Sequence, residues 1–340
     1  MMDAPRILET QCEWTSDDLP DASVYTEVLT PSETSELDAA LRHALSISAD
    51  VLDIERDDFP LDGLAQRLAR IENELIEGRG LVRIRGIDRS RYDQAEMEMI
   101  YWGIGMHLGT PWAQNKHGHM LGDVTDQGRA TNDPEARGNE LGGIALPFHT
   151  DGSDLVGLLC LQDGVEGGLA TAANSVSIHN RLVHESPELA AELYKLQPFD
   201  FRGEQAKGGK GWYTMPVFTE CDGRLFVRCI PPYILASQRH EDAPRLTDIA
   251  KRALARVVEL ADDPQHHISM ELAPGDIQFI NNYHVLHGRT AYRDDRAAGS
   301  VRHLKRLWLE TRVLARRPDH FKNTMTDWSR NRSASRMTVN

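Results

Sequence analysis

Several features that mark specialised classes of protein are scarce or missing in this sequence. The 340 residues include only four cysteines, Cys12, Cys160, Cys221 and Cys229, and no two of them have the CxxC spacing of a zinc ribbon. No apolar run approaches the ~20 residues of a membrane span, and the first residues lack the basic and apolar segments of a secretory signal. We therefore expect free thiols, no membrane partner and a cytoplasmic location.

Basic charge is also in short supply. The sequence has 38 Lys and Arg residues against 52 Asp and Glu residues, which gives a formal net charge of −14. A nucleic-acid-binding protein needs a basic surface that displaces counterions, and no basic stripe with interleaved aromatic residues is present here. The composition therefore argues against a nucleic-acid partner.

The periodic segments that are present indicate the class of fold. Apolar residues at helical spacing predict five helices, over residues 34–46, 62–78, 92–108, 175–196 and 244–261. Short apolar or alternating runs predict strands over 78–88, 156–162, 213–218, 224–229, 267–272, 276–281 and 301–310. Helices come first and many short strands follow, without the regular alternation of a doubly wound sheet. This order predicts an α+β protein, a β-sandwich or barrel with helices packed outside it.

The domain organisation is expected to be simple. We find no repeats and no low-complexity linker, and we predict one catalytic domain over 1–340. Within it, 1–78 is expected to be mostly helical, 79–312 to form the core, and 313–340 to be a polar tail.

One long segment, residues 109–145, is rich in Gly, Asn, Asp and Pro and is predicted to be irregular. Such segments inside domains often cover a functional site. Its candidates for substrate contact are Trp112, Gln114, Asn115, His117 and His119. Each of them is equally compatible with packing inside the loop.

The stretch LPFHTDGSD contains a candidate metal-binding pair. In an extended chain, His149 and Asp151 point to the same side and Thr150 points away. HxD alone is common by chance, so a metal site is supported only if the chain supplies a third ligand. Two histidines and one carboxylate form the facial triad of non-haem Fe(II) oxygenases.

Candidates for the third ligand lie in GDIQFINNYHVLHGRTAY. A predicted strand runs into a turn at Asn281 and Asn282, and His284 and His287 follow. His287 precedes Gly288, which lets the backbone approach a bound group closely. Either histidine alone is also compatible with an ordinary surface position.

Two arginines follow in VRHLKRLWL. Arg302 and Arg306 are four residues apart and face the same side of a strand. Guanidinium groups on a part-buried strand are costly unless they meet anions, and arginine binds carboxylates through a bidentate fork. The pattern favours two anionic small molecules, or one such molecule and a structural carboxylate, although a solvated strand face gives the same alternation.

Taken together, HTD, EGG (166–168), NNYHVLHGR and RHLKR resemble the taurine dioxygenase family of Fe(II)/2-oxoglutarate-dependent oxygenases over residues 80–312. The motifs are most similar to those of its γ-butyrobetaine hydroxylase and clavaminate synthase relatives. The resemblance implies a double-stranded β-helix (jelly-roll, cupin-like) core with flanking helices. It also implies the roles of the residues: iron ligands at His149, Asp151 and His287, an arginine for the distal carboxylate of 2-oxoglutarate at Arg302, and a substrate-binding arginine at Arg306.

The chain departs from the family pattern at one position. Many members have a threonine soon after the Gly-Gly pair that touches 2-oxoglutarate, but strict spacing places Ala170 there and Thr171 one residue later. A shift of one residue in a strand turns a side chain to the other face. Thr171 is therefore a weaker expectation as a cosubstrate contact.

The resemblance implies a reaction that consumes O2 and 2-oxoglutarate, releases succinate and CO2, and hydroxylates an unactivated C–H bond. Arg306 predicts a small substrate with a carboxylate, sulfonate or phosphonate, with Asp154 and Asp123 as conceivable partners of an ammonium group. The alternative outcomes of the reaction are desaturation, cyclisation or cleavage. The alternative functions are an oxidase that does not use 2-oxoglutarate, a demethylase acting on macromolecules, and a non-catalytic metal-binding jelly roll. Homo-oligomers are the family tendency.

Overall fold

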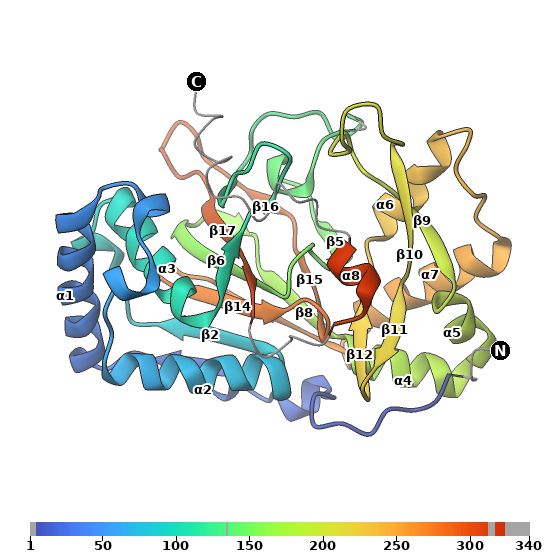
Figure 1. The fold of residues 1–340 in the computed structure, drawn as a ribbon, viewed down its shortest axis with the longest axis horizontal. Helices are drawn as coiled ribbons and strands as arrows, with labels where there is room; N and C mark the ends of the chain where they lie inside the picture. Colours follow the sequence, from blue (N-terminus) through green and yellow to red (C-terminus); the bar gives the residue numbers. More distant parts are fainter. Residues whose placement is uncertain (1–4, 134, 312–316, 324–340) are drawn as a thin grey trace.

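The computed structural model describes residues 5–133, 135–311 and 317–323. At its centre is a seven-stranded major sheet with the order β1-β2-β14-β6-β17-β3, and β4 also pairs with β17 (Figure 1). Its strands are β1 (Thr26–Val28), β2 (Leu81–Arg85), β3 (Thr110–Trp112), β4 (Leu121–Val124), β6 (Leu155–Gln162), β14 (Ile277–Asn281) and β17 (His303–Glu310).

A four-stranded minor sheet has the order β13-β8-β15-β5. Its strands are β5 (Leu146–His149), β8 (Ala170–Asn174), β13 (His267–Met270) and β15 (Val285–Arg289). Residues from both sheets, such as Val156 and Leu304 of the major sheet and Ala172 of the minor sheet, share one buried cluster. The two sheets therefore form the jelly-roll core that the sequence predicted.

Smaller strand pairs extend this core. They are β7 (Glu166–Gly167) with β16 (Tyr292–Arg293), β9 (Leu196–Asp200) with β10 (Trp212–Pro216), and β11 (Phe218–Cys221) with β12 (Arg224–Val227). The last two pairs lie beside the minor sheet in Figure 1.

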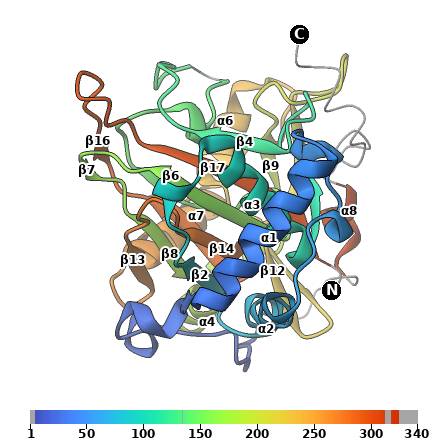
Figure 2. The ribbon, with the colours of Figure 1, turned by 90° about the vertical axis from the view of Figure 1, so that its left-hand side faces the viewer.

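Helices lie on both sides of the core. On one side, α2 (Gly63–Glu77) and α3 (Gln94–Leu108) contact the major sheet, and α1 (Pro31–Ile47) packs on them (Figure 2). On the other side are α4 (Ser175–Glu185), α5 (Pro187–Leu193), α6 (Pro231–Ala236) and α7 (Asp248–Asp262), while α8 (Asp319–Asn323) lies near the described C-terminal end. Within the described ranges, no helix has the length and apolar character needed to cross a membrane.

Most predicted helices are confirmed, with two differences. Thr30 caps α1 by accepting a hydrogen bond from the backbone of Glu33, and the apolar stripes of α1 and α2 are buried as expected. The predicted helix over 175–196 is wrong as one element, because it breaks at Ser186 before Pro187, where a proline lacks the backbone donor that a continuous helix needs. The helix predicted from 244 begins only at Asp248, after its cap Thr247.

The prediction that residues 109–145 are irregular throughout is also wrong, because β3 and β4 lie there and pair with β17. The division into one domain with three parts stays a prediction. Of the tail predicted over 313–340, residues 317–323 are described and include α8, and 313–316 and 324–340 lie outside the described residues.

Candidate active site

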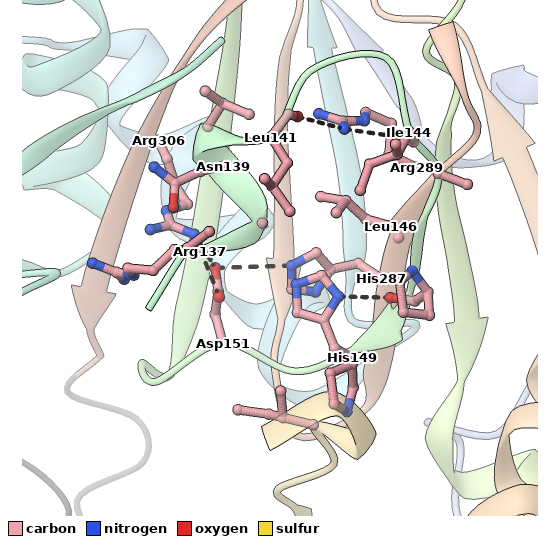
Figure 3. Close-up of a pocket in the computed structure, with 18 of the residues that line it drawn as sticks. Arg137, Asn139, Leu141, Ile144, Leu146, His149, Asp151, His287, Arg289 and Arg306 are labelled. Carbon is pink, nitrogen blue, oxygen red and sulfur yellow. Dashed lines mark hydrogen bonds and ion pairs between the residues drawn. The ribbon is translucent and has the colours of Figure 1, made fainter. Parts of the chain in front are cut away.

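The three predicted metal ligands come together on the inner side of the minor sheet (Figure 3). His149 ends β5 and His287 lies in β15, and the two are direct partners in the antiparallel register, with ring centroids 4.3 Å apart. Asp151 follows β5, and its Oδ2 lies 3.8 Å from His287 Nε2. One potential ligand atom from each residue lies within 4.8 Å of the others. The spacing fits a single metal ion.

Hydrogen bonds fix the position of Asp151. Its backbone N–H donates to Asn282 Oδ1 at 2.9 Å, and Asn282 Nδ2 donates to the carbonyl of Ser153 at 3.0 Å. The indole Nε1 of Trp308 donates to Asp151 Oδ2 at 3.0 Å. The backbone N–H of Thr150 donates to the carbonyl of Cys229, and its hydroxyl accepts from the backbone N–H of Cys229. The sequence marked Asn282 only as a turn residue and did not reveal this contact with the metal-ligand loop.

The electrostatics of the three side chains suit a divalent metal. His149 Nδ1 lies 2.8 Å from the carbonyl of Pro147, which can only accept, so Nδ1 carries the proton and Nε2 has a free lone pair. Burial, and then the His149 ring, lowers the pKa of His287 to about 3 and keeps it neutral. Burial opposes ionisation of Asp151, but the charge of Arg306, together with the hydrogen bond from Trp308, holds the pKa of that carboxyl well below its usual range. Two neutral imidazoles and one carboxylate are the donor set of a non-haem Fe(II) site.

His284, the alternative third ligand, is not part of this group. It is buried, and its Nδ1 lies 3.3 Å from the side-chain amide of Asn281. Burial lowers the pKa of His284 to about 4. The structure places this histidine in the packing of the β14–β15 turn.

A cavity of about 320 Å³ opens over the metal-ligand group, between the two sheets. Its apolar lining includes Val156 and Leu304 of the major sheet and Leu146 of the minor sheet. Its charged lining is mostly basic and consists of Arg137, Arg202, Arg289, Arg302 and Arg306 against Asp133 and Asp151. The cavity therefore favours anionic ligands with a small apolar body.

Arg302 lies at one end of this cavity. It is 4% exposed, its Nη2 donates to the carbonyl of Gly168 at 3.2 Å, and its Nη1 is buried without a partner among the described residues. Gly168 has φ of 73°, and a Cβ there would lie 2.8 Å from Arg302 Nε. The second glycine of the EGG motif thus makes room for the guanidinium.

Arg306 lies next to Asp151. Its Nη1 is 3.3 Å from Asp151 Oδ2, and its Nε donates to Gln114 Oε1 at 2.8 Å. Arg306 lines the cavity while it is also paired with the carboxylate of a metal ligand.

Other predicted contact residues are not brought into the cavity. Gln114 is buried and donates to the carbonyls of Met120 and Arg306, both at 2.7 Å, and Asn115 bonds within its own loop. Ala170 lines the cavity, but Thr171, the next residue of β8, does not. Neither Asp123, which accepts from His303, nor Asp154, which accepts from Tyr283, is among the lining residues.

Sequence reasoning also missed several lining residues. Arg289, Arg137, Arg202 and Tyr233 all reach the cavity from different parts of the chain. Only Arg289 had a sequence signal, as the last residue of the HGR motif.

Residues 43–308 match the family described as "Taurine catabolism dioxygenase TauD, TfdA family". The chain belongs to this family. An FR-33289 synthase of Streptomyces rubellomurinus is 33% identical over 303 residues, covering 87% of this chain and 88% of that protein. A taurine hydroxylase-like protein, SAT17, of Stachybotrys chartarum is 26% identical, covering 88% of this chain and 79% of that protein.

Solved structures of other oxygenases share the fold. An asparagine oxygenase in complex with Fe(II), 2S,3S-3-hydroxyasparagine and succinate has a TM-score of 0.65 and 19% identity, covering 84% of this chain and 94% of that one. The non-haem iron oxygenase OrfP in complex with Fe and alpha-ketoglutaric acid has a TM-score of 0.61 and 19% identity, covering 84% and 93%.

This TauD-family protein is an Fe(II)- and 2-oxoglutarate-dependent dioxygenase. The residues present fit that chemistry, because His149, Asp151 and His287 provide the donor set for iron and leave coordination positions open. Arg302, whose buried Nη1 has no partner within residues 5–133, 135–311 and 317–323, provides a cation for a carboxylate beside it.

Proposed function

We propose that this dioxygenase hydroxylates an unactivated C–H bond of a small metabolite that carries an acidic group. The observation that carries the proposal is the arginine-rich cavity directly over the two-histidine, one-carboxylate group. Iron and 2-oxoglutarate supply the oxidising chemistry when bound, with O2 consumed and succinate and CO2 released. The residues of the chain bind and orient the reactants and exclude water.

His149, Asp151 and His287 hold the iron, and Arg302 pairs with the distal carboxylate of 2-oxoglutarate. Burial of Arg302 without a carboxylate partner in the described chain supports this role, because an unpaired buried guanidinium is costly unless a ligand completes it. Burial also lowers the pKa of Arg302, and a bound anion would offset this effect.

The acidic group of the substrate binds on the opposite side of the site, at Arg306 and Arg137. The guanidinium of Arg137 donates to the carbonyl of Gln114 at 3.0 Å, and its Nη1 lies 3.8 Å from Glu204 Oε1. The cavity is at the small end of the range of about 300–1,000 Å³ for ligand sites. It must hold both reactants, so the substrate is small.

Hydroxylation is preferred over other oxidation outcomes because solved relatives of this fold carry hydroxylated amino acids, 3-hydroxyasparagine in one and 3-hydroxyarginine in another. A carboxylate, sulfonate or phosphonate would each suit a guanidinium pair. The substrate is therefore an amino acid or another small anionic metabolite.

The first test is anaerobic. Fe(II) and then 2-oxoglutarate are added to metal-free protein, and visible absorbance is followed with Asp151→Ala as the control. A new charge-transfer band that requires Asp151 supports the site, and small anionic metabolites are then screened for substrate-dependent succinate release with product mass increased by one oxygen. Iron binding without the band would contradict the assignment of Arg302.

We also infer a cytoplasmic location, which the unpaired state of all four cysteines supports. A single catalytic domain and assembly into homo-oligomers stay predictions from the sequence.

A further inference from the structure

A second arginine lies beside Arg302 in the same cavity and has no ionic partner in the described part of the chain. Arg289 is 5% exposed, and its Nη2 donates to the carbonyls of Leu141 and Ile144, at 3.2 and 2.9 Å. Figure 3 shows these two contacts. Its Nε and Nη1 are buried and have no hydrogen-bond partner among the described residues.

Tyr292 joins the two arginines into one cluster. Its ring lies 4.6 Å from the Arg289 guanidinium carbon and 5.4 Å from that of Arg302. The hydroxyl of Tyr292 is also buried without a partner in the described chain. Arg289 and Arg302 therefore bring several donors without partners in the described chain to the same cavity, and the Tyr292 ring lies beside both.

This concentration of unpaired donors indicates an anion site. Two buried guanidinium groups repel one another and lose hydration, so their proximity is costly unless an anion is bound between them. The residue of β8 that lines the cavity is Ala170, which has no side-chain donor for an anion.

We infer that Arg289 completes the binding site for the distal carboxylate of 2-oxoglutarate, so that two arginines hold this group. The inference rests on the proposed role of Arg302. Arg289 acts in binding and positioning the cosubstrate. Because its Nη2 holds the carbonyls of Leu141 and Ile144, the bound carboxylate also anchors the cavity wall formed by 141–146.

The test compares two keto acids that differ only at the distal end. 2-Oxoglutarate and 2-oxopentanoate share the keto acid head, but 2-oxopentanoate has a methyl group in place of the distal carboxylate. Their affinities are measured by anaerobic calorimetry on the Mn(II)-loaded protein, in the wild type and in Arg289→Gln, Arg302→Gln and Tyr292→Phe. Arg293→Gln is the matched control, because Arg293 is near in sequence but exposed and paired with Glu166.

Arg289→Gln is expected to weaken 2-oxoglutarate binding by about 10- to 100-fold, the range for loss of a charged hydrogen bond. Binding of 2-oxopentanoate should change less than about twofold, because that ligand lacks the group that Arg289 contacts. Tyr292→Phe keeps the ring beside both arginines and should change 2-oxoglutarate binding little, and Arg293→Gln should have no effect. If Arg289→Gln does not fold, Arg289→Lys should keep part of the preference for 2-oxoglutarate.

Two results would overturn the inference. Equal weakening of both keto acids would show that Arg289 only supports the cavity wall, and an unchanged preference would show that it does not contact the carboxylate. Neither result contradicts the role of Arg302, provided that Arg302→Gln abolishes the preference for 2-oxoglutarate over 2-oxopentanoate. A wild type without any preference for 2-oxoglutarate would instead overturn the proposed function together with the inference.

Discussion

Replacing Asn282 should weaken metal binding although this residue is not a ligand. Asn282 is fully buried, and its side chain accepts from the Asp151 backbone and donates to Ser153 O and Oγ, at 2.9, 3.0 and 3.2 Å. Asn282→Ala removes three hydrogen bonds at about 1 kcal/mol each, and leaves buried backbone groups unpaired. We expect a loss of about 3 kcal/mol in unfolding free energy and a loss of about 10- to 100-fold in metal affinity.

Asn281 provides the matched control. It is equally buried, but it bonds Leu75 O at 3.0 Å and Tyr283 N at 2.9 Å and does not touch the loop that carries Asp151. Asn281→Ala should therefore lose similar stability and keep its affinity for metal.

Urea denaturation of the metal-free proteins gives the stability change, and titration with Mn(II) followed by electron paramagnetic resonance gives the affinity. The reasoning is refuted if Asn282→Ala binds metal like the wild type, or if Asn281→Ala loses metal affinity to the same extent.

Three further predictions concern other parts of the site. The pKa of His284 is about 4 in the folded protein against 6.5 when unfolded, so the unfolded state binds more protons between these pH values. The free energy of unfolding should therefore fall by about 3 kcal/mol as the pH drops from about 6.5 to 4. Urea unfolding should show a smaller fall in the His284→Gln variant. Gly168→Ala places a Cβ 2.8 Å from Arg302 Nε, at a residue with a positive φ. This variant should raise the KM for 2-oxoglutarate about tenfold, and steady-state kinetics should show a smaller change in kcat. Arg317→Met removes the cation that lies 2.6 Å from the buried carboxylate of Asp154 and should cost about 3–5 kcal/mol in thermal or urea unfolding, whereas the double variant with Asp154→Asn should recover part of this.

The metal ligands could be predicted from sequence because their signal is local. His149 and Asp151 are two residues apart in an extended segment, so their side chains lie on the same side of the chain. The family motif distinguishes His287 from His284. Asn282 was not recognised, because its function depends on the β14–β15 turn lying against the loop after β5. That contact joins segments that are distant in the chain, and no local pattern reports it.

The short strands of the minor sheet were harder to predict for a related reason. LPFH in β5 contains a proline and ATAAN in β8 is mostly alanine, so each has only one of the β-branched or aromatic residues typical of strands. Their conformation is set by pairing with β15. The position of Gln114 was similarly invisible, because its partner is the backbone of Arg306 in a distant strand.

The direct pairing of His149 with His287 has a consequence for folding. A metal bound by both histidines closes a long loop of chain, as a covalent cross-link does, and a cross-link between distant residues restricts the unfolded chain most strongly when the loop is long. A shift by one residue in the β5–β15 pairing would turn one imidazole to the opposite face of the sheet. The metal therefore stabilises only the correctly aligned sheet, and its loss should expose this part of the protein to proteases before the rest unfolds.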